Sequence, residues 1–283
     1  MGTADIVARE ASGASSASTD PGRRIDGYLV CGGKYHDFDF ARLELLKLLA
    51  VDDHVRVRVA QHFGDVAAIT ASDFLVTYTC DVRPSPEEQQ AVRSWVERGG
   101  RWVALHGTNC VLDPPDGPDA RTYRAPRSIP VWADTLGSQF LSHPPIEPYA
   151  VHRSPGADGD PLVAGIEAFE TGADELYLME HHGEIIPLLE TRWTGTTRGF
   201  AEGDWPRDEP RLVLYRRPLG DGEVVYFTLG HCRSHWDMVD PPHNGARWPT
   251  IDRGSWEVAE FIEILRRAIA WAAAATPWAT RPT

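Results

Sequence analysis

Residues 99–109, GGRWVALHGTN, read as a helix end, a short buried strand and an abrupt exit at His106. Two glycines close the preceding helical segment, and the apolar run up to Leu105 has the composition of a buried strand. A strand that ends in such a corner is typical of α/β enzymes, in which the corner usually carries a serine or cysteine nucleophile. The histidine at this corner therefore bears directly on the reaction class.

Strand and helix patterns alternate around this stretch. The strand-like segments before it are DGYLVCGG (26–33), HVRVRVA (54–60) and DFLVTYTC (73–80). In FARLELLKLLA (40–50), Leu43, Leu46, Leu49 and Ala50 recur at helical spacing. SPEEQQAVRSWVERGG (85–100) is a second helix, which Ser85 caps, Pro86 suits in its first turn and Gly99 ends. Repeated strand–helix–strand units predict a parallel sheet covered on both faces.

The second half of the chain predicts a different kind of pairing. Residues 111–146 look like a long surface excursion with a helical segment at 131–140. Strand-like segments follow at 147–153, 174–179 and 184–193, and then a hairpin over 211–231 that turns at 220–222 and ends the sheet. A final helix at 255–275 has an apolar side, formed by Val258, Phe261, Ile262, Leu265, Ala268 and Ile269.

The predicted fold class is therefore α/β: a three-layer, doubly wound, mostly parallel sheet with an antiparallel C-terminal hairpin. We expect one domain over residues 25–276, a disordered Ala/Ser/Gly-rich tail over 1–24, and a short tail over 277–283.

Charge and composition exclude several classes of function. With 28 Lys and Arg against 41 Asp and Glu, the formal net charge is −13, and no basic run is present, so nucleic acid is an unsuitable partner. No apolar stretch is long enough for a membrane span or a signal peptide. Four widely spaced cysteines, Cys31, Cys80, Cys110 and Cys232, fit neither a zinc knot nor a disulfide framework, and all four suit small buried apolar positions. We expect a cytoplasmic protein.

Polar residues follow the predicted strands where ligands bind in open parallel sheets, beyond their carboxyl ends. His36 and Asp37 follow the first strand, His106 follows the fourth, and His231 and His235 follow the last. Each has a simpler explanation, because Asp37 can cap a helix and His106 or His231 can be a core histidine. Together they predict one shared site at this edge.

Further candidate site residues are predicted at the same edge of the sheet. In DELYLM, Glu175 and Tyr177 alternate onto the same face of a predicted strand. The predicted substrate-binding residues are Asp37, Asn109, His143, Tyr177, His235 and Trp236. His181 and His182 fit a solvated loop. Ten tryptophans, several of them near these loops, suit a pocket with flat apolar walls, as sugar rings prefer.

The ordered motifs GGKYHDFDF, ERGGRWVALHG, LGSQFLSHPP, DELY and GDGEVVYFTLGHCRSHW resemble the ThuA-like (trehalose-utilisation) family over residues 27–273. This family is a branch of the class I glutamine-amidotransferase-like superfamily, so the resemblance implies a flavodoxin-like fold and a role in carbohydrate metabolism. Amidotransferases carry cysteine where this chain has His106, and glutamate where it has Arg233. An imidazole cannot form a glutamyl thioester, which excludes ammonia release from glutamine.

Two readings of the site stay open. His36, His106 and His231 could bind a divalent metal such as Zn²⁺ or Mn²⁺, or they could act with Glu175 as acids and bases on a sugar. The family context indicates a disaccharide, glycoside or keto-sugar substrate, acted on by a hydrolase, lyase or isomerase. A two-carboxylate glycosidase is the weakest enzyme hypothesis, since Glu175 and Asp37 are its only candidate pair. The alternative is a non-catalytic carbohydrate-binding or regulatory module. A homodimer is compatible with the exposed aromatic loops.

Overall fold

The computed structural model describes residues 23–116, 122–237 and 248–274. Its strands are β1 Ile25–Gly33, β2 Val55–Ala60, β3 Phe74–Cys80, β4 Arg101–Leu105, β5 Ser138–Ser142, β6 Ala150–Arg153, β7 Phe169–Glu170, β8 Leu178–His181, β9 Ile186–Thr196, β10 Asp204–Leu219 and β11 Gly222–Phe227. Its α-helices are α1 Phe38–Leu49, α2 Val66–Thr70, α3 Pro86–Glu97, α4 Pro130–Leu136 and α5 Ala259–Ala273, with 3₁₀ turns η1 His106–Asn109 and η2 Gly254–Glu257.

Nine of these strands form one mixed sheet in the order β2-β1-β3-β4-β11-β10-β9-β6-β7. The pairs from β2 to β11 are all parallel. Every residue of β3 is buried, as is β4 after Arg101, because central parallel strands are covered on both faces. The first four strands follow the 2-1-3-4 order of flavodoxin-like sheets.

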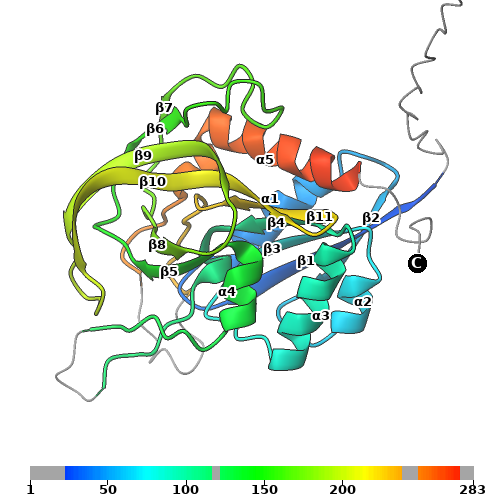
Figure 1. Ribbon diagram of the computed structural model, residues 1–283, viewed down its shortest axis with the longest axis horizontal. Helices are drawn as coiled ribbons and strands as arrows, with labels where there is room; N and C mark the ends of the chain where they lie inside the picture. Colours follow the sequence, from blue (N-terminus) through cyan, green and yellow to red (C-terminus); the bar gives the residue numbers. More distant parts are fainter. Residues whose placement is uncertain (1–22, 117–121, 238–247, 275–283) are drawn as a thin grey trace, which may run out of the picture.

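Helices cover both faces of the parallel part, as Figure 1 shows. One apolar cluster joins α1 and α5 to one face, and the other joins α2, α3 and α4 to the opposite face. The buried residues of α1 are Ala41, Leu45 and Leu49, whereas Leu43, which the spacing assigned to the apolar side, is 53% exposed. The periodicity was thus right and the face was wrong, because leucines occur all round this helix.

The antiparallel part is larger than the predicted hairpin. β10 and β11 pair from Leu219 with Gly222, at the predicted turn, but the sheet does not end there. β9 pairs with β10, and β6 and β7 extend the sheet further. Figure 1 shows β9 and β10 as a long curved ribbon that leaves the parallel layer.

The predicted excursion over 111–146 contains regular structure. α4 ends at Leu136 because Gly137 adopts the left-handed conformation, with φ of 81°. Ser138–Ser142 is therefore not helix but strand β5, which pairs with β8 in a small second sheet. This small sheet places His143 and the segment before β8 beside the main sheet.

The described part includes only a little of the predicted terminal tails. Of the tail predicted over 1–24, Arg23 and Arg24 are described, and Arg23 is bonded to Asp73 at 3.1 Å. The remaining tail residues and the predicted tail 277–283 lie outside the described residues. Within the described ranges, no helix is long and apolar enough to cross a membrane.

Helix α3, which supports β4, begins with the capping box that the sequence predicts. The Ser85 hydroxyl accepts a hydrogen bond from the Glu88 N–H, and the Glu88 carboxylate accepts one from the Ser85 N–H. We expect Ser85→Ala to lower the free energy of unfolding by about 1 kcal/mol, measured by urea denaturation. The matched variant Ser85→Asp keeps an acceptor at this position, so equal losses in both variants would contradict the capping role.

Candidate functional site

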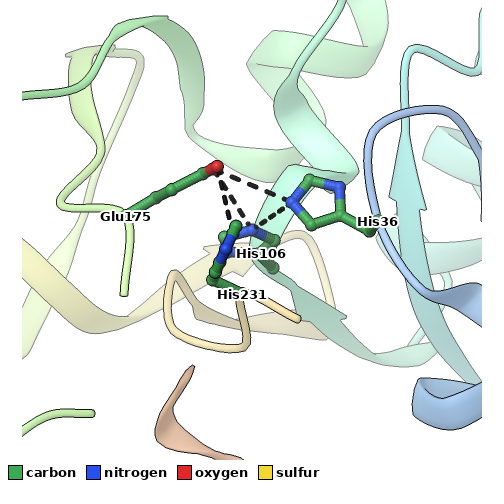
Figure 2. A group of neighbouring side chains, drawn as sticks. All are labelled: His36, His106, Glu175 and His231. Carbon is green, nitrogen blue, oxygen red and sulfur yellow. Dashed lines mark hydrogen bonds and ion pairs between the residues drawn. The ribbon is translucent and has the colours of Figure 1, made fainter. Parts of the chain in front are cut away.

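Three histidines and one glutamate meet at the carboxyl edge of the parallel strands. His36 follows β1, His106 follows β4, His231 follows β11, and Glu175 lies just before β8. Each offers one ligand atom, and these four atoms lie within 4.8 Å of one another. Figure 2 shows the Glu175 carboxylate facing all three imidazoles. We call these four side chains the histidine–glutamate cluster.

His106 is fixed from behind by backbone groups. Its Nδ1 lies 2.7 Å from the Thr228 carbonyl oxygen, and a carbonyl only accepts, so Nδ1 carries the proton. Its Nε2 therefore presents a lone pair to the cluster. The ring packs against Tyr177 and Tyr78, with centroids 4.7 and 5.9 Å away, and is almost entirely buried.

His36 and His106 approach each other through their Nε2 atoms. Their Nε2 atoms lie 2.8 Å apart, and His36 Nδ1 lies 3.3 Å from the Lys34 carbonyl oxygen. If both Nδ1 atoms donate to carbonyls, both Nε2 atoms carry lone pairs that face each other. Such a contact is stable only when a proton or a cation lies between the two nitrogens.

His231 points into the cluster from the third side. Its Nδ1 lies 3.1 Å from Glu175 Oε1 and its Nε2 lies 3.6 Å from Asp252 Oδ2. The side chain is fully buried, yet neither ring nitrogen makes a hydrogen bond of good geometry. A carboxylate behind a histidine is the usual means of orienting an imidazole toward a metal ion.

Glu175 supplies the negative charge of the cluster. Its Oε2 lies 3.4 Å from His106 Nε2 and 3.8 Å from His36 Nε2, while its Oε1 lies 4.0 Å from His143 Nε2. Burial alone would raise the pKa of Glu175, but the neighbouring His143 and His231 hold its pKa well below the usual range. The cluster therefore keeps a buried carboxylate that attracts cations.

The same charge acts on the histidines. Burial lowers the pKa of each, but the Cys80 thiol and Glu175 raise the pKa of His36 to about 10. Glu175 and Asp252 likewise raise the pKa of His231 to about 9. Burial and the charge of His36 lower the pKa of His106. Two imidazoles thus tend to be cationic and one neutral when nothing else balances the carboxylate.

Backbone strain is concentrated at this edge. Among the described residues, the non-glycine residues with positive φ are Tyr35, Asp81 and His106, at 75°, 54° and 47°. They follow β1, β3 and β4, which are neighbours in the sheet. Such conformations cost free energy and cluster at functional sites. The positive φ angles are a backbone observation, independent of the side-chain distances, and they lie at the same edge of the sheet as the cluster.

Asp174 joins the loops that carry the cluster. Its buried Oδ1 accepts from the N–H groups of Glu175 and His231, at 2.8 and 3.1 Å. Its Oδ2 accepts from the N–H groups of Gly230 and Ser255, at 3.1 and 3.2 Å. The loops pack so closely that a Cβ at Gly172 would lie 2.0 Å from the Gly254 carbonyl oxygen. One carboxylate therefore fixes Glu175 and His231 relative to each other.

A cavity of about 300 Å³ opens onto the cluster. It is lined by Tyr35, His36, Cys80, Cys110, Leu112, Tyr123, Phe140, His143, Ile146, Glu175, Tyr177, Phe200, Arg233 and Trp248. His36 and Glu175 face this cavity, while His106 and His231 lie behind them. The cluster is therefore reached from one side.

Of the predicted substrate-binding residues, His143 and Tyr177 line the cavity and the other four do not. Asp37 caps α1 by accepting from the Phe40 N–H and pairs with Arg253 at 2.9 Å. Asn109 is buried and donates to Ser138. His235 Nδ1 lies 3.1 Å from the Trp248 carbonyl oxygen, so His235 supports a lining residue. Trp236 is 61% exposed.

The segment that carries Glu175 differs from its predicted form. β8 begins only at Leu178, so Glu175 and Tyr177 precede the strand. They reach the same cavity because Asp174 anchors the turn before them, not because of strand alternation. Glu175 and Tyr177 therefore reach the same cavity, as predicted, but from a turn and not from a strand.

Comparison with known proteins supplies the family. Residues 30–243 match the family model described as ThuA, trehalose utilisation. This chain belongs to the ThuA family. It is similar in fold to ThuA-like proteins from Parabacteroides merdae ATCC 43184 (TM-score 0.58, 17% identity, 89% of this chain and 91% of that one) and Bacteroides uniformis ATCC 8492 (TM-score 0.58, 14% identity, 92% and 95%). No curated protein matches its sequence.

The sequence pattern did not predict several residues around the cavity of this ThuA chain. Asp174 directly precedes Glu175 in the DELY motif, so the motif itself was a signal for it. Asp252 and Phe200 are far in sequence from any motif, and only the folded loops bring them to the cluster and the cavity. Of the strand-end cysteines, the sequence favours Cys31 and Cys110 as pocket-lining residues; Cys110 and Cys80 line the cavity, whereas Cys31 is buried in the core.

We expect Asp174→Asn to lower the free energy of unfolding by about 2–4 kcal/mol, because each oxygen accepts two buried N–H groups and an amide nitrogen accepts none. Urea denaturation measures the loss. The matched control is Asp208→Asn, which removes an exposed partner of Arg192 and should cost less than about 1 kcal/mol. Similar losses in the two variants would contradict the anchoring role.

Stability without metal should depend on pH through the same groups. The pKa values of His36 and His231 are raised above the ordinary 6.5, so their protonation stabilises the fold fully below pH 6.5. This stabilisation is lost as the pH rises through about 9 and 10. We expect unfolding free energies of chelator-treated protein to fall by on the order of 1–3 kcal/mol over this window. Glu175→Gln should flatten the change, and an unaltered profile in that variant would count against the assignment.

Proposed function

We propose that this ThuA chain is an enzyme of sugar metabolism that acts on a disaccharide, glycoside or keto-sugar at a divalent-metal centre. The centre consists of the histidine–glutamate cluster, with His36 Nε2, His106 Nε2, His231 Nδ1 and one Glu175 oxygen as ligands. Zn²⁺ and Mn²⁺ are the ions that suit three imidazoles and a carboxylate.

The observation that carries this proposal is the 2.8 Å separation of the two Nε2 atoms of His36 and His106. Two ring nitrogens at this separation need a proton or a cation between them, and a bound divalent ion would replace the proton that His36 otherwise holds. The nearby Glu175 carboxylate and the unsatisfied, buried His231 nitrogens add two further donors around the same point. Asp252 behind His231 and the Thr228 carbonyl behind His106 supply the orienting groups that metal-bound imidazoles usually have.

The family description, trehalose utilisation, supports a sugar as the substrate. A divalent ion bound at the cluster supplies Lewis-acid polarisation of a substrate oxygen. His143 is a base that lines the cavity beside the cluster: its Nδ1 lies 2.6 Å from the Pro144 carbonyl oxygen, so Nδ1 carries the proton and Nε2 has the lone pair. His143 Nε2 faces the cavity and can accept the acidic proton next to a keto group, which begins an elimination or isomerisation.

The absence of an amidotransferase dyad agrees with this proposal. His106 stands at the strand corner, and Arg233, at the position where amidotransferases have glutamate, is paired with Asp237 at 2.6 Å. His106 thus stands in place of the cysteine nucleophile and Arg233 in place of the glutamate, so neither role is filled at these two positions.

Metal analysis tests the centre directly. We expect chelator-free wild-type protein to bind about one equivalent of zinc or manganese, and His106→Ala and Glu175→Gln to bind far less, as measured by elemental mass spectrometry. Glu175→Gln preserves the side-chain shape, and the control His152→Ala removes an exposed histidine outside the cluster. The same three variants are then assayed for turnover of keto-disaccharides.

Loss of metal and of turnover in the two cluster variants, with both retained in the control, supports the proposed enzyme. Turnover without metal would favour histidine acid–base catalysis. Sugar binding without any product would favour a binding module. A wild-type protein that takes up no divalent ion contradicts the proposed centre.

A further inference from the structure

A continuous row of aromatic rings leads away from the histidine–glutamate cluster along the cavity. Tyr177 packs on His106 with centroids 4.7 Å apart, and Phe140 packs on Tyr177 at 4.6 Å. Phe200 follows at 5.7 Å from Phe140 and also lies 4.9 Å from the ring of His143. The inner part of this row therefore borders both the cluster and the nearby base.

The outer part of the row is partly exposed. Tyr123 lies 6.5 Å from Phe200, and Tyr35 lies 6.2 Å from Tyr123. Tyr177 and Phe140 are buried, whereas Phe200, Tyr123 and Tyr35 are half-buried. We call Tyr177, Phe140, Phe200, Tyr123 and Tyr35 the aromatic wall. It runs from the cluster to solvent and offers apolar faces to more than one sugar ring.

The wall is held rigidly although its members come from distant segments. Phe200 lies in the loop between β9 and β10, whose ribbon is seen in Figure 1. The Tyr123 N–H donates to the Gly199 carbonyl at 2.8 Å, and the Ala201 N–H donates to the Tyr123 carbonyl at 2.9 Å. A second tie joins the Ser142 hydroxyl to the Glu202 carbonyl at 2.8 Å. The loop is thus fixed against the rest of the cavity.

The aromatic wall offers little to an anionic group. Among the described lining residues, Arg233 is the one lysine or arginine. Its guanidinium makes a bidentate contact with Asp237, at 2.6 and 3.0 Å, and stacks on Trp248 at 3.9 Å. Its charge is therefore already neutralised. A phosphate along the aromatic wall would lose its hydration without gaining a free cationic partner.

We propose that the aromatic wall is a binding subsite for the second ring of an uncharged two-ring glycoside, with the reacting ring at the histidine–glutamate cluster. This inference rests on the proposed function for the choice of a sugar. The C–H faces of a pyranose ring stack on Phe200 and Tyr123, and removal of this apolar surface from water provides the affinity. The reacting ring alone contacts only the inner wall, so a monosaccharide binds more weakly, and a phosphorylated disaccharide is rejected.

Titration calorimetry with the full chain tests the subsite, using α,α-trehalose, glucose and trehalose 6-phosphate as probes. We expect trehalose to bind wild type at least about 10-fold more tightly than either other probe. Phe200→Ala and Tyr123→Ala should each weaken trehalose binding by roughly 10-fold and leave glucose binding within about 2-fold of wild type. The control Trp193→Ala removes a half-buried aromatic side chain from the same ribbon, outside the cavity lining.

Bound metal is measured in every sample, because this separates the two proposals. Equal affinities for trehalose and glucose, tight binding of trehalose 6-phosphate, no binding of trehalose, or equal effects of Phe200→Ala and Trp193→Ala would each overturn the subsite. If any of these occurs with metal present, the metal centre stands while the subsite fails. Wall-dependent trehalose binding without metal would support the subsite and contradict the centre.

Discussion

Two imidazole nitrogens held 2.8 Å apart set the requirement that the rest of the site must meet, because a proton or a cation has to lie between them. Backbone carbonyls behind the rings of His36 and His106 impose this arrangement, and the strained corner at His106 keeps it from relaxing. A buried carboxylate across from them then makes the point between the rings attractive to positive charge. A proton on His36 or a cation between the rings satisfies this arrangement.

The adjacent residues Asp174 and Glu175 have different roles in the histidine–glutamate cluster. Glu175 faces the imidazoles, whereas Asp174 turns the other way and satisfies four backbone N–H groups. Because both of its oxygens accept backbone hydrogen bonds, Asp174 is satisfied in the interior without a cationic partner. Asp174 can therefore hold the loops of Glu175 and His231 together without competing for the charge that Glu175 needs.

The sequence predicted the histidine edge because parallel strands end at a common edge, a rule that needs no tertiary detail. His36, His106 and His231 follow three such strands and meet as expected. The sequence predicted side-chain contacts less well where those contacts depend on how loops pack against the sheet edge. Asp37 and His235 sit beside strand ends in the sequence, yet their side chains turn to a helix N-terminus and a backbone carbonyl. Phe200 has no local signal, because its position depends on how the ribbon of β9 and β10 packs against the cavity.

The side chains of the histidine–glutamate cluster and the aromatic side chain Phe200 come from different parts of the chain. The groups of the histidine–glutamate cluster come from the parallel sheet edge and the Asp174 loop, while Phe200 comes from the ribbon tip. The tip can therefore change in length or sequence without moving any atom of the cluster. Such a division lets the surface beside the cluster vary while the cluster itself stays constant.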